Sequence, residues 1–398
     1  MTTSFEPGAP AQEGSIPLSV PEIGGNAWKY VNQCLDTGWV SSVGAFVDRF
    51  ESDLAAYVGA KYGVAACSGT AALHIALLVA NVQPDDEVLI STLTFIAPAN
   101  AVRYVGAWPV FIDAEPEYWQ LDVTKVAAFL EDECAWSNGE LRNKTTGRRV
   151  KGILPVHILG HPVDMDPLLE LARKYDLVVI EDATEGLGAK YKGRMIGHIG
   201  DIGCFSFNGN KIITTGGGGM LVTDNQAWAT KAKYLSTQAK DDPVEYIHHQ
   251  IGYNYRLTNI QAALGCAQME QLPDHIAIKR RIASLYTESF KEITSLTPMR
   301  EAPWASSVFW LYTLLVDESV HKKSSRELMR ALDEQAIQAR PLWQPLHLSH
   351  AHAGSQSYQC VESERLNRTA LSLPSSIGLS SEHQTLVINA VRDFFLLR

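Results

Sequence analysis

The stretch GILPVHILGHPVDMDPLLELARKYDLVVIED, residues 152–182, contains two short apolar runs separated by one amphipathic segment. The runs GILPVHI (152–158) and LVVIED (177–182) contain several β-branched residues and have the length of buried strands. The segment DMDPLLELARKY (164–175) begins with acids and ends with bases, which suits the dipole of a helix. The order strand, helix, strand predicts a βαβ unit, and hence a parallel sheet covered by helices on both faces.

The same alternation extends from about residue 46 to residue 225. Helical patterns occupy 46–59 and 70–80, and short apolar runs predict further strands at 87–91, 108–113, 201–207 and 219–223. Later residues predict helices over 258–272, 275–293 and 324–335 and a strand over 306–317. The polar segment 134–149 reads as an exposed loop. We therefore predict a loose lead-in (1–18), a large α/β domain (19–259) and a smaller C-terminal α+β domain (260–398).

Composition narrows the class of protein. The chain has 398 residues, 46% of them hydrophobic, and a net charge of -10, which argues against a nucleic-acid partner. Its six cysteines form no C-x-x-C pair, so neither a disulfide framework nor a metal site is expected. No stretch reaches the roughly 18 apolar residues of a membrane span, and the N-terminus has no signal-peptide pattern. These features predict a cytoplasmic enzyme with no membrane attachment.

Two acids, Glu181 and Asp182, end the strand predicted at 177–182. Ligands of open α/β sheets bind outside the carboxyl ends of the strands, and a carboxylate there is costly without a partner. Asp182 is therefore a candidate to face a protonated ring nitrogen, as a pyridoxal phosphate site requires. A helix cap or a structural ion pair explains Asp182 equally well.

Lys211 lies in FNGNKIITTGGGGM, residues 207–220. A phosphate loop places its lysine after the glycines, whereas Lys211 precedes them, so such a loop is not expected. A lysine amine is the nucleophile that condenses with an aldehyde cofactor. A surface lysine on a turn is the alternative.

The start of the helix predicted at 70–80 is a candidate phosphate site. Ser68, Gly69 and Thr70 bring together free backbone N–H groups, the positive end of the helix dipole and hydroxyl groups. An ordinary Ser/Thr cap explains the same residues without any ligand.

The order of these three signals resembles the DegT/StrS-type sugar aminotransferases, which belong to the fold-type I pyridoxal phosphate enzymes. The resemblance runs from SVPEIGGNAW at residue 19 to near the C-terminus. The matching motifs are, in order, TGWVSSVGAFVDRFE, YVGAKYGVAACSGTAALHIAL, TFIAPANAV, PVFID, VVIEDATEGLGAKYKGRMIGHIGDIGCFSF, ITTGGGGM and GYNYRLTNIQAALG. The resemblance implies the fold-type I architecture, with a mainly parallel central sheet flanked by helices, and pyridoxal 5′-phosphate as cofactor.

The resemblance also implies roles for single residues. Lys211 is similar to the Schiff-base lysine that shuttles protons, and Asp182 to the partner of the pyridine nitrogen. Phe95 in LTFIAP is similar to the aromatic residue that stacks on the ring, although core packing is its alternative. Position 185 commonly holds Gln, which bonds the ring hydroxyl oxygen; Glu185 cannot donate to that oxygen unless it is protonated.

Four more positions match the family's phosphate-binding residues or its subunit contacts. Gly69, Thr70 and Ser206 match the phosphate cradle. Asn254 in GYNYRL matches a residue that reaches the phosphate from the neighbouring subunit, which implies a homodimer with shared active sites. Alternatively, Asn254 is only a turn residue before the helix that starts at Thr258.

Two motifs resemble particular subgroups of the family. The motif SFNGNK resembles the corresponding motif of aminotransferases that act on nucleotide-linked 4-keto-6-deoxy sugars. The nearest match is to the aminotransferases that make UDP-4-amino sugars for bacillosamine or legionaminic acid. GDP-perosamine synthases share the GNK portion and are the competing subgroup. ARPLWQPLH (339–347) also resembles the UDP-sugar group, and there Arg340 and His347 are candidate substrate contacts, with a surface ion pair as the alternative for Arg340.

The resemblance therefore implies transfer of an amino group from glutamate to UDP-2-acetamido-2,6-dideoxy-4-keto-hexose or a similar nucleotide sugar. A sugar dehydratase of the same fold carries histidine in place of the Schiff-base lysine, so Lys211 argues against that activity. A non-catalytic regulatory protein would keep the same cofactor site, and the sequence leaves this alternative open.

Overall fold

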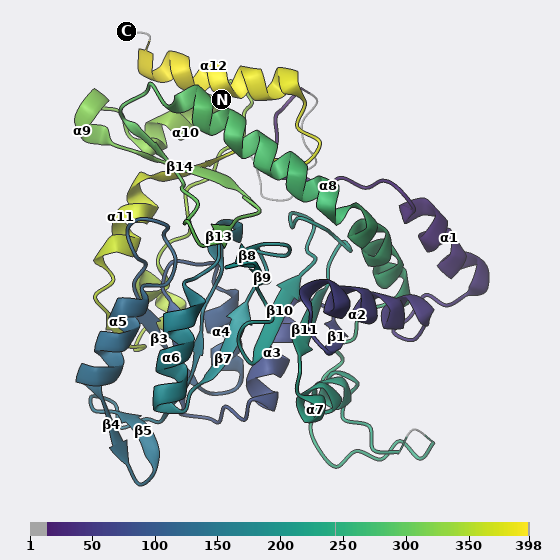
Figure 1. The fold of residues 1–398 in the computed structure, drawn as a ribbon. Coiled ribbons are helices and arrows are strands. Elements are labelled where there is room, and N and C mark those ends of the chain that lie inside the picture. Colours follow the sequence, from purple (N-terminus) through teal and green to yellow (C-terminus); the bar gives the residue numbers. More distant parts are fainter. Residues whose placement is uncertain (1–13, 243, 397–398) are drawn as a thin grey trace.

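An eight-stranded sheet forms the centre of the molecule (Figure 1). The computed structural model describes residues 14–242 and 244–396. Across the sheet the strands are β1 (Tyr62–Ala66), β11 (Gly219–Thr223), β10 (Ile202–Ser206), β7 (Val178–Asp182), β6 (Val150–Leu154), β2 (Glu87–Ser91), β3 (Trp108–Ile112) and β15 (Ser357–Tyr358). Strand β11 runs antiparallel to both of its neighbours, and all other neighbouring pairs are parallel. The predicted α/β class with a mainly parallel sheet is confirmed.

Helices cover both faces of this sheet, as the predicted βαβ units require. One face packs against α3 (Gly69–Val79), α4 (Ala97–Tyr104) and α7 (Gln226–Ser236). The other face packs against α2 (Ala45–Val58), α5 (Val123–Ala128), α6 (Met165–Tyr175) and the first half of α8 (Asn259–Phe290). Because neither face meets solvent, β2 and β11 are buried along their whole length.

A second, three-stranded antiparallel sheet lies in the C-terminal part of the chain. Its strands are β12 (Leu296–Pro298), β14 (Tyr312–Val316) and β16 (Ala370–Leu373). Its apolar side packs against α10 (Ser325–Asp333), α12 (Ser381–Leu396) and the second half of α8. Helix α8 therefore contributes to both cores, and Figure 1 shows it running from the helices beside the large sheet to α12.

The remaining elements are short and lie at the edges. They are α1 (Ala27–Thr37), the π-helix η1 (Phe129–Glu133), β4 (Cys134–Ser137), β5 (Glu140–Asn143), the 3-10 helix η2 (Ile158–Gly160), β8 (Lys190–Tyr191), β9 (Arg194–Met195), β13 (Ala305–Ser306), α9 (Glu318–His321), the 3-10 helices η3 (Leu346–Leu348) and η4 (His350–His352), and α11 (Val361–Thr369). Helix α1 packs on α8, and β13 joins β8 and β9 in a small sheet.

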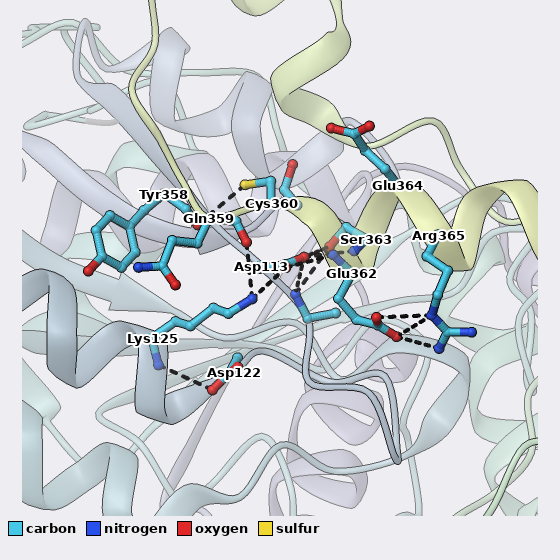
Figure 2. A network of polar contacts seen from close by, with 12 residues as sticks. Asp113, Asp122, Lys125, Tyr358, Gln359, Cys360, Glu362, Ser363, Glu364 and Arg365 are labelled. Atoms are coloured by element: carbon cyan, nitrogen blue, oxygen red, sulfur yellow. Dashed lines mark hydrogen bonds and ion pairs between the residues drawn. The ribbon is translucent and has the colours of Figure 1, made fainter.

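A buried carboxylate fixes the C-terminal segment to the large sheet, as Figure 2 shows. Asp113 follows β3 and accepts hydrogen bonds from the backbone N–H groups of Glu362 (2.9 Å) and Ser363 (2.7 Å) at the start of α11. Lys125 donates to the same carboxylate at 2.6 Å and to the carbonyl of Gln359 at 3.0 Å. This contact holds α11 beside β3, and Asn367 of α11 in turn donates hydrogen bonds to the carbonyls of Leu342 and Trp343.

Three local predictions differ from the structure. The two helices expected at 258–272 and 275–293 are one helix, α8, which continues through Pro273. The segment expected as an exposed loop at 134–149 contains the β4–β5 hairpin, whose Leu141 and Asn143 are buried. Strand β14 is shorter than the predicted 306–317, because the chain before it turns at Phe309 with a φ of 48°.

The predicted division into domains stays a prediction. Helix α8 begins at the predicted boundary, but β15, from the C-terminal part, joins the large sheet. Residues 1–13 of the predicted lead-in lie outside the described residues, and Ile16 is buried and paired with Ile337. Within 14–242 and 244–396, no helix has the length and apolar character needed to cross a membrane.

Candidate active site

The main candidate site is a cavity of about 670 Å³ at the carboxyl ends of β7 and β10. Its position is the one at which open α/β sheets bind ligands. The predicted site residues that line it are Gly69, Thr70, Phe95, Asp182, Glu185, Ser206, Lys211 and Arg340. The structure thus brings together residues from six separate parts of the chain.

The start of α3 forms one end of this cavity. The Ser68 hydroxyl accepts a hydrogen bond from the Ala71 N–H at 3.0 Å, so Ser68 acts as the helix cap. The N–H groups of Gly69 and Thr70 have no acceptor inside the helix, because they belong to its first turn. Together with the positive end of the helix dipole, they suit a phosphate group.

Close packing requires glycine at two positions beside this helix start. A Cβ atom at Gly69 would lie 2.8 Å from the Cβ of Ser206, so a side chain there would displace the end of β10. A Cβ atom at Gly219 would lie 2.4 Å from the carbonyl oxygen of Ser68. The last residue of the four-glycine run therefore allows β11 to begin directly against the start of α3.

Asp182 is the last residue of β7 and is 3% exposed. One carboxylate oxygen accepts the N–H of Thr184 at 3.1 Å. Burial raises the pKa of Asp182, and the bond to Thr184 and the charge of Lys211 only partly oppose that rise. A cation in the cavity would favour the ionised form of this carboxylate.

Glu181 lies on the opposite side of β7 and has a structural environment. It accepts hydrogen bonds from His157 Nε2 at 3.0 Å and from the backbone N–H groups of Gly197, Ile199 and Gly200. Burial alone would raise the pKa of Glu181, but these hydrogen bonds outweigh burial and the pKa is lowered. Glu181 therefore holds the turn at 197–200 and does not face the cavity.

Lys211 extends into the cavity from the turn that precedes the glycines. Its amine nitrogen lies 3.6 Å from Glu185 Oε1 and 4.1 Å from the ring centroid of Trp310. The Lys211 side chain is only 13% exposed, so the alternative of an ordinary surface lysine does not describe it.

Glu185 is buried between the cavity and an unusual backbone turn. Its second oxygen accepts the N–H of Leu159 at 2.8 Å, and Leu159 has a φ of 58°, a left-handed conformation that a leucine rarely adopts. Burial raises the pKa of Glu185 to about 7, although the charge of Lys211 acts in the opposite direction. Near neutral pH, Glu185 is therefore able both to accept and to donate a hydrogen bond.

Phe95 is 56% exposed although it is apolar, and its ring lines the cavity between β2 and α4. Core packing therefore does not explain Phe95. Arg340, Trp343 and Gln344 form another part of the lining. This wall offers a guanidinium group, which suits a phosphate-bearing ligand.

Two predicted site residues lie away from the cavity lining. His347 contacts Thr92 Oγ1 through Nδ1 at 2.8 Å and Glu364 through Nε2 at 3.2 Å, so both ring nitrogens have protein partners. Its predicted substrate contact has no support in this geometry. Asn254 is exposed and pairs with Thr237 on the chain's own surface, so it does not reach this chain's cavity.

The sequence of residues 21–392 matches that of one aminotransferase family, DegT/DnrJ/EryC1/StrS. The chain is 38% identical over 377 residues to a GDP-perosamine synthase of Caulobacter vibrioides, covering 94% of this chain and 97% of the relative. It is 38% identical over 382 residues to a GDP-perosamine synthase of Escherichia coli O157:H7, covering 96% and 98%. The chain belongs to the DegT/DnrJ/EryC1/StrS aminotransferase family.

The solved structures agree with this assignment. A DegT DnrJ EryC1 StrS aminotransferase from Brucella abortus superposes with a TM-score of 0.85 at 26% identity, covering 93% of this chain and 95% of the other. The predicted family and the aminotransferase fold are thus confirmed. The aminotransferases of this family use pyridoxal 5′-phosphate, which is therefore the cofactor of this chain.

The cavity of this family member fits that cofactor in three respects. The start of α3, which carries no side chain at Gly69, lines the cavity and offers free N–H groups to a phosphate. The buried Asp182 with its raised pKa suits a protonated ring nitrogen. Among residues 14–242 and 244–396, Lys211 offers the only lysine amine in the lining of this cavity.

Sequence reasoning missed other residues that line the cavity of this aminotransferase. Trp310 faces the Lys211 amine, and Thr184 supports Asp182. Trp343 forms part of the wall beside Arg340. The run FWLYTLLV suggested only a buried strand, so nothing in its pattern indicated that Trp310 faces a ligand site.

Proposed function

We propose that this aminotransferase moves the amino group of glutamate to the 4-keto carbon of a nucleotide-linked 4-keto-6-deoxy sugar. The observation that carries the proposal is the convergence of Asp182, Glu185, Lys211 and the start of α3 on one cavity. The cofactor, when bound, accepts the amino group and stabilises the carbanion formed beside it. The family supports amino transfer, and the two GDP-perosamine synthases support a sugar acceptor.

The chain's residues would divide the work as follows. The start of α3 and Ser206 would hold the cofactor's phosphate, and Phe95 would contact its ring. Asp182 keeps the ring nitrogen protonated, which is an electrostatic contribution to the transition state. Lys211 moves the proton, because its amine is the base that projects into the cavity.

The wall that carries Arg340 would bind the nucleotide sugar. The Arg340 guanidinium suits a diphosphate, which accepts two parallel hydrogen bonds from such a group. A cavity of about 670 Å³ is within the range of small-molecule sites. His347, which contacts Thr92, would act indirectly by holding the segment that carries Arg340.

We propose a UDP-linked 2-acetamido-2,6-dideoxy-4-keto-hexose as the acceptor, because SFNGNK and ARPLWQPLH resemble that subgroup. A GDP-linked 4-keto-6-deoxy sugar is the second candidate, and the two GDP-perosamine synthases at 38% identity favour it. The cavity residues that would contact a diphosphate suit both nucleotides.

We also propose a homodimer with shared sites. Asn254 is exposed and outside its own cavity, so it is available to a neighbouring subunit. Large apolar side chains around α1, namely Trp28, Trp39 and Val43, are exposed in the single chain. A second copy of the chain would bury such a surface.

The test uses purified protein with bound cofactor, glutamate, and a panel of UDP- and GDP-linked 4-keto-6-deoxy sugars. Mass and NMR spectra of the products identify the acceptor and the configuration at carbon 4. Without sugar, glutamate alone should convert the cofactor from its aldehyde-derived form to its amine form, and the absorbance spectrum should change accordingly. A protein that binds cofactor but shows neither change would be a regulatory protein, and the proposal would then fail.

A further inference from the structure

Trp310 lies two residues before β14 and is 4% exposed, yet it lines the cavity. The Lys211 amine lies 4.1 Å from the centroid of this ring, within the range of a cation–π contact. The Glu185 carboxylate lies 3.6 Å from the same amine. The lysine amine therefore has two attractive partners, one aromatic and one anionic.

Three hydrogen bonds fix the position of Trp310. Its indole N–H donates to the carbonyl of Asn210 at 2.7 Å, one residue before Lys211. Its backbone N–H donates to the carbonyl of Leu159 at 2.9 Å, and the buried Lys279 amine donates to its backbone carbonyl at 2.8 Å. These bonds leave the ring little freedom, so it is set in place before a ligand binds.

Leu159 connects the two partners of the lysine amine. Its N–H donates to Glu185, and its carbonyl accepts the N–H of Trp310. The left-handed backbone at Leu159 makes both contacts possible from one residue. A strained backbone conformation that surrounding hydrogen bonds hold in place is typical of a functional site.

A lysine that bonds to a cofactor and is later released needs a place for its free amine. In water-poor surroundings an ammonium group without partners is costly, and an aromatic face stabilises it without forming a bond that is hard to break. An anionic partner alone would hold the amine more tightly. The ring of Trp310 therefore provides a weak, directional contact for the released amine.

We propose that Trp310 holds the amine of Lys211 when that amine is free of the cofactor and carries a proton. The inference rests on the proposed role of Lys211 in amino transfer. Among the described residues, the other charged groups that line this cavity are Glu185, Asp182 and Arg340. Of these, Glu185 contacts the amine directly. Trp310 is thus a contact of the reacting group and not only a member of the core.

The experiment measures the reactivity of Lys211 in cofactor-free protein. An acylating reagent reacts only with uncharged amines, and mass spectrometry then gives the labelling rate of each lysine at several pH values. Trp310→Leu keeps an apolar side chain but removes the aromatic face, so we expect Lys211 labelling at fixed pH to rise about fivefold. Trp310→Phe keeps an aromatic face and should restore most of the wild-type rate.

Two references make the comparison specific. Lys192 is half-exposed and paired with Asp166, so its labelling rate should be equal in wild type and in the Trp310 variants. Trp304→Leu removes a tryptophan that packs on Tyr191 and does not line the main cavity, so Lys211 labelling should not change. If Trp310→Leu fails to fold, fluorinated tryptophans at position 310 keep the shape and weaken the aromatic face, and labelling should rise with the number of fluorines.

Several results would overturn the inference. Unchanged Lys211 labelling in Trp310→Leu, or flat labelling across the fluorinated series, would show that the ring does not stabilise the amine. Equal labelling in the Leu and Phe variants would assign the effect to the bond with Asn210 instead. Because no cofactor or sugar is present, these outcomes are separate from failure of the proposed amino transfer.

Discussion

Glu181 and Asp182 are adjacent acids whose environments differ because successive side chains of a strand point to opposite faces. The sequence predicts this alternation, and it predicts that one acid meets the ligand site. It does not predict the partners of Glu181, because the N–H groups of the turn at 197–200 come together only in the folded chain. The sequence therefore predicts the role of a single side chain better than it predicts the hydrogen-bond partners of that side chain.

The sequence also fails to predict the tertiary contacts of three other residues, Lys211, His347 and Trp310. A cofactor-binding lysine requires one residue type, so the sequence indicates Lys211 directly. The contact between Lys211 and Trp310 joins positions that are far apart in the chain, and no local pattern reports it. His347 was expected at the substrate, but its ring nitrogens are used by Thr92 and Glu364, which only the tertiary structure brings close.

We predict that Asp182→Asn lowers kcat at least about a hundredfold, equivalent to about 3 kcal/mol in the barrier. A neutral amide does not favour the protonated ring nitrogen, so the electron sink is weakened. Steady-state kinetics with glutamate measure the loss. Asp176→Asn makes the same chemical change at the exposed, left-handed end of α6 and should be fully active. Normal activity of Asp182→Asn would mean that Asp182 is only a structural residue.

We predict that Glu185→Gln changes the pH dependence of stability in the cofactor-free protein. Burial raises the pKa of Glu185 from 4.5 to about 7, so the folded state binds a proton that the unfolded state has lost between these values. Its stabilising contribution is complete below the unfolded pKa and disappears as the pH rises through the folded pKa. Glutamine does not titrate, so the variant's free energy of unfolding should not show this fall with rising pH.

Urea unfolding at about pH 5 and about pH 8 provides the measurement. From about pH 5 to about pH 8, the free energy of unfolding should fall more in wild type than in Glu185→Gln. The difference between the two falls should be up to about 3 kcal/mol. Glu318→Gln, at an exposed position in α9, should behave as wild type. Parallel pH profiles for wild type and Glu185→Gln would contradict the raised pKa.

At the scale of elements, regular patterns were predictable and long-range pairings were not. Helix α6 and strands β2 and β11 were expected from periodicity and flanking charges, and they occur within one or two residues of the predicted bounds. Strand β15 has only two residues and forms because β3 offers an edge. Helix α8 passes through Pro273, where sequence rules place a break, because packing on both cores outweighs one lost backbone hydrogen bond.

We predict that Asp113→Asn lowers the free energy of unfolding by about 3 kcal/mol at neutral pH. The change leaves Lys125 without its buried anion and weakens the bonds to the start of α11 (Figure 2). Burial by itself raises the pKa of Asp113, but Lys125 and Ser363 outweigh it, and the pKa is lowered. The contribution of the carboxylate is therefore present above its unfolded pKa and lost as the pH falls through its folded pKa.

Chemical denaturation at neutral and acidic pH tests this prediction, since the difference from wild type should shrink in acid. Arg365→Gln is the matched control. It breaks an ion pair with Glu362 in the same network, but the arginine side chain is 39% exposed, so the loss should be below about 1 kcal/mol. Equal effects of the two variants would show that Asp113 does not hold α11.

At the scale of the whole molecule, the cavity lies where three parts of the chain meet. The start of α3 and the end of β7 come from the large sheet, Trp310 precedes a strand of the small sheet, and Arg340 pairs with Ser372 in the C-terminal part. The wall that would bind the sugar is thus built by the part of the chain that Asp113 fixes to β3. Changes in that attachment should affect binding of the sugar more than binding of the cofactor.

The last prediction concerns the proposed dimer. Lys211→Ala removes the reacting amine, and Asn254→Asp places a negative charge where the phosphate of a neighbouring subunit would lie, so each variant alone should be inactive. In a mixed dimer, one site would combine a native Lys211 with a native Asn254. Random reassembly of equal amounts gives mixed dimers in about half of the molecules, with one working site each, so activity should return to about one quarter of wild type.

The measurement requires proof that mixed dimers form, which two different affinity tags on the variants provide. Thr237→Ala, at the position that pairs with Asn254 within the chain, is a control whose own homodimer should be active without any mixing. An active monomer, or inactive mixed dimers of proven composition, would contradict a shared site. Recovery of activity would instead show that the exposed Asn254 belongs functionally to the cavity of the partner subunit, which explains why it lies outside the cavity of its own chain.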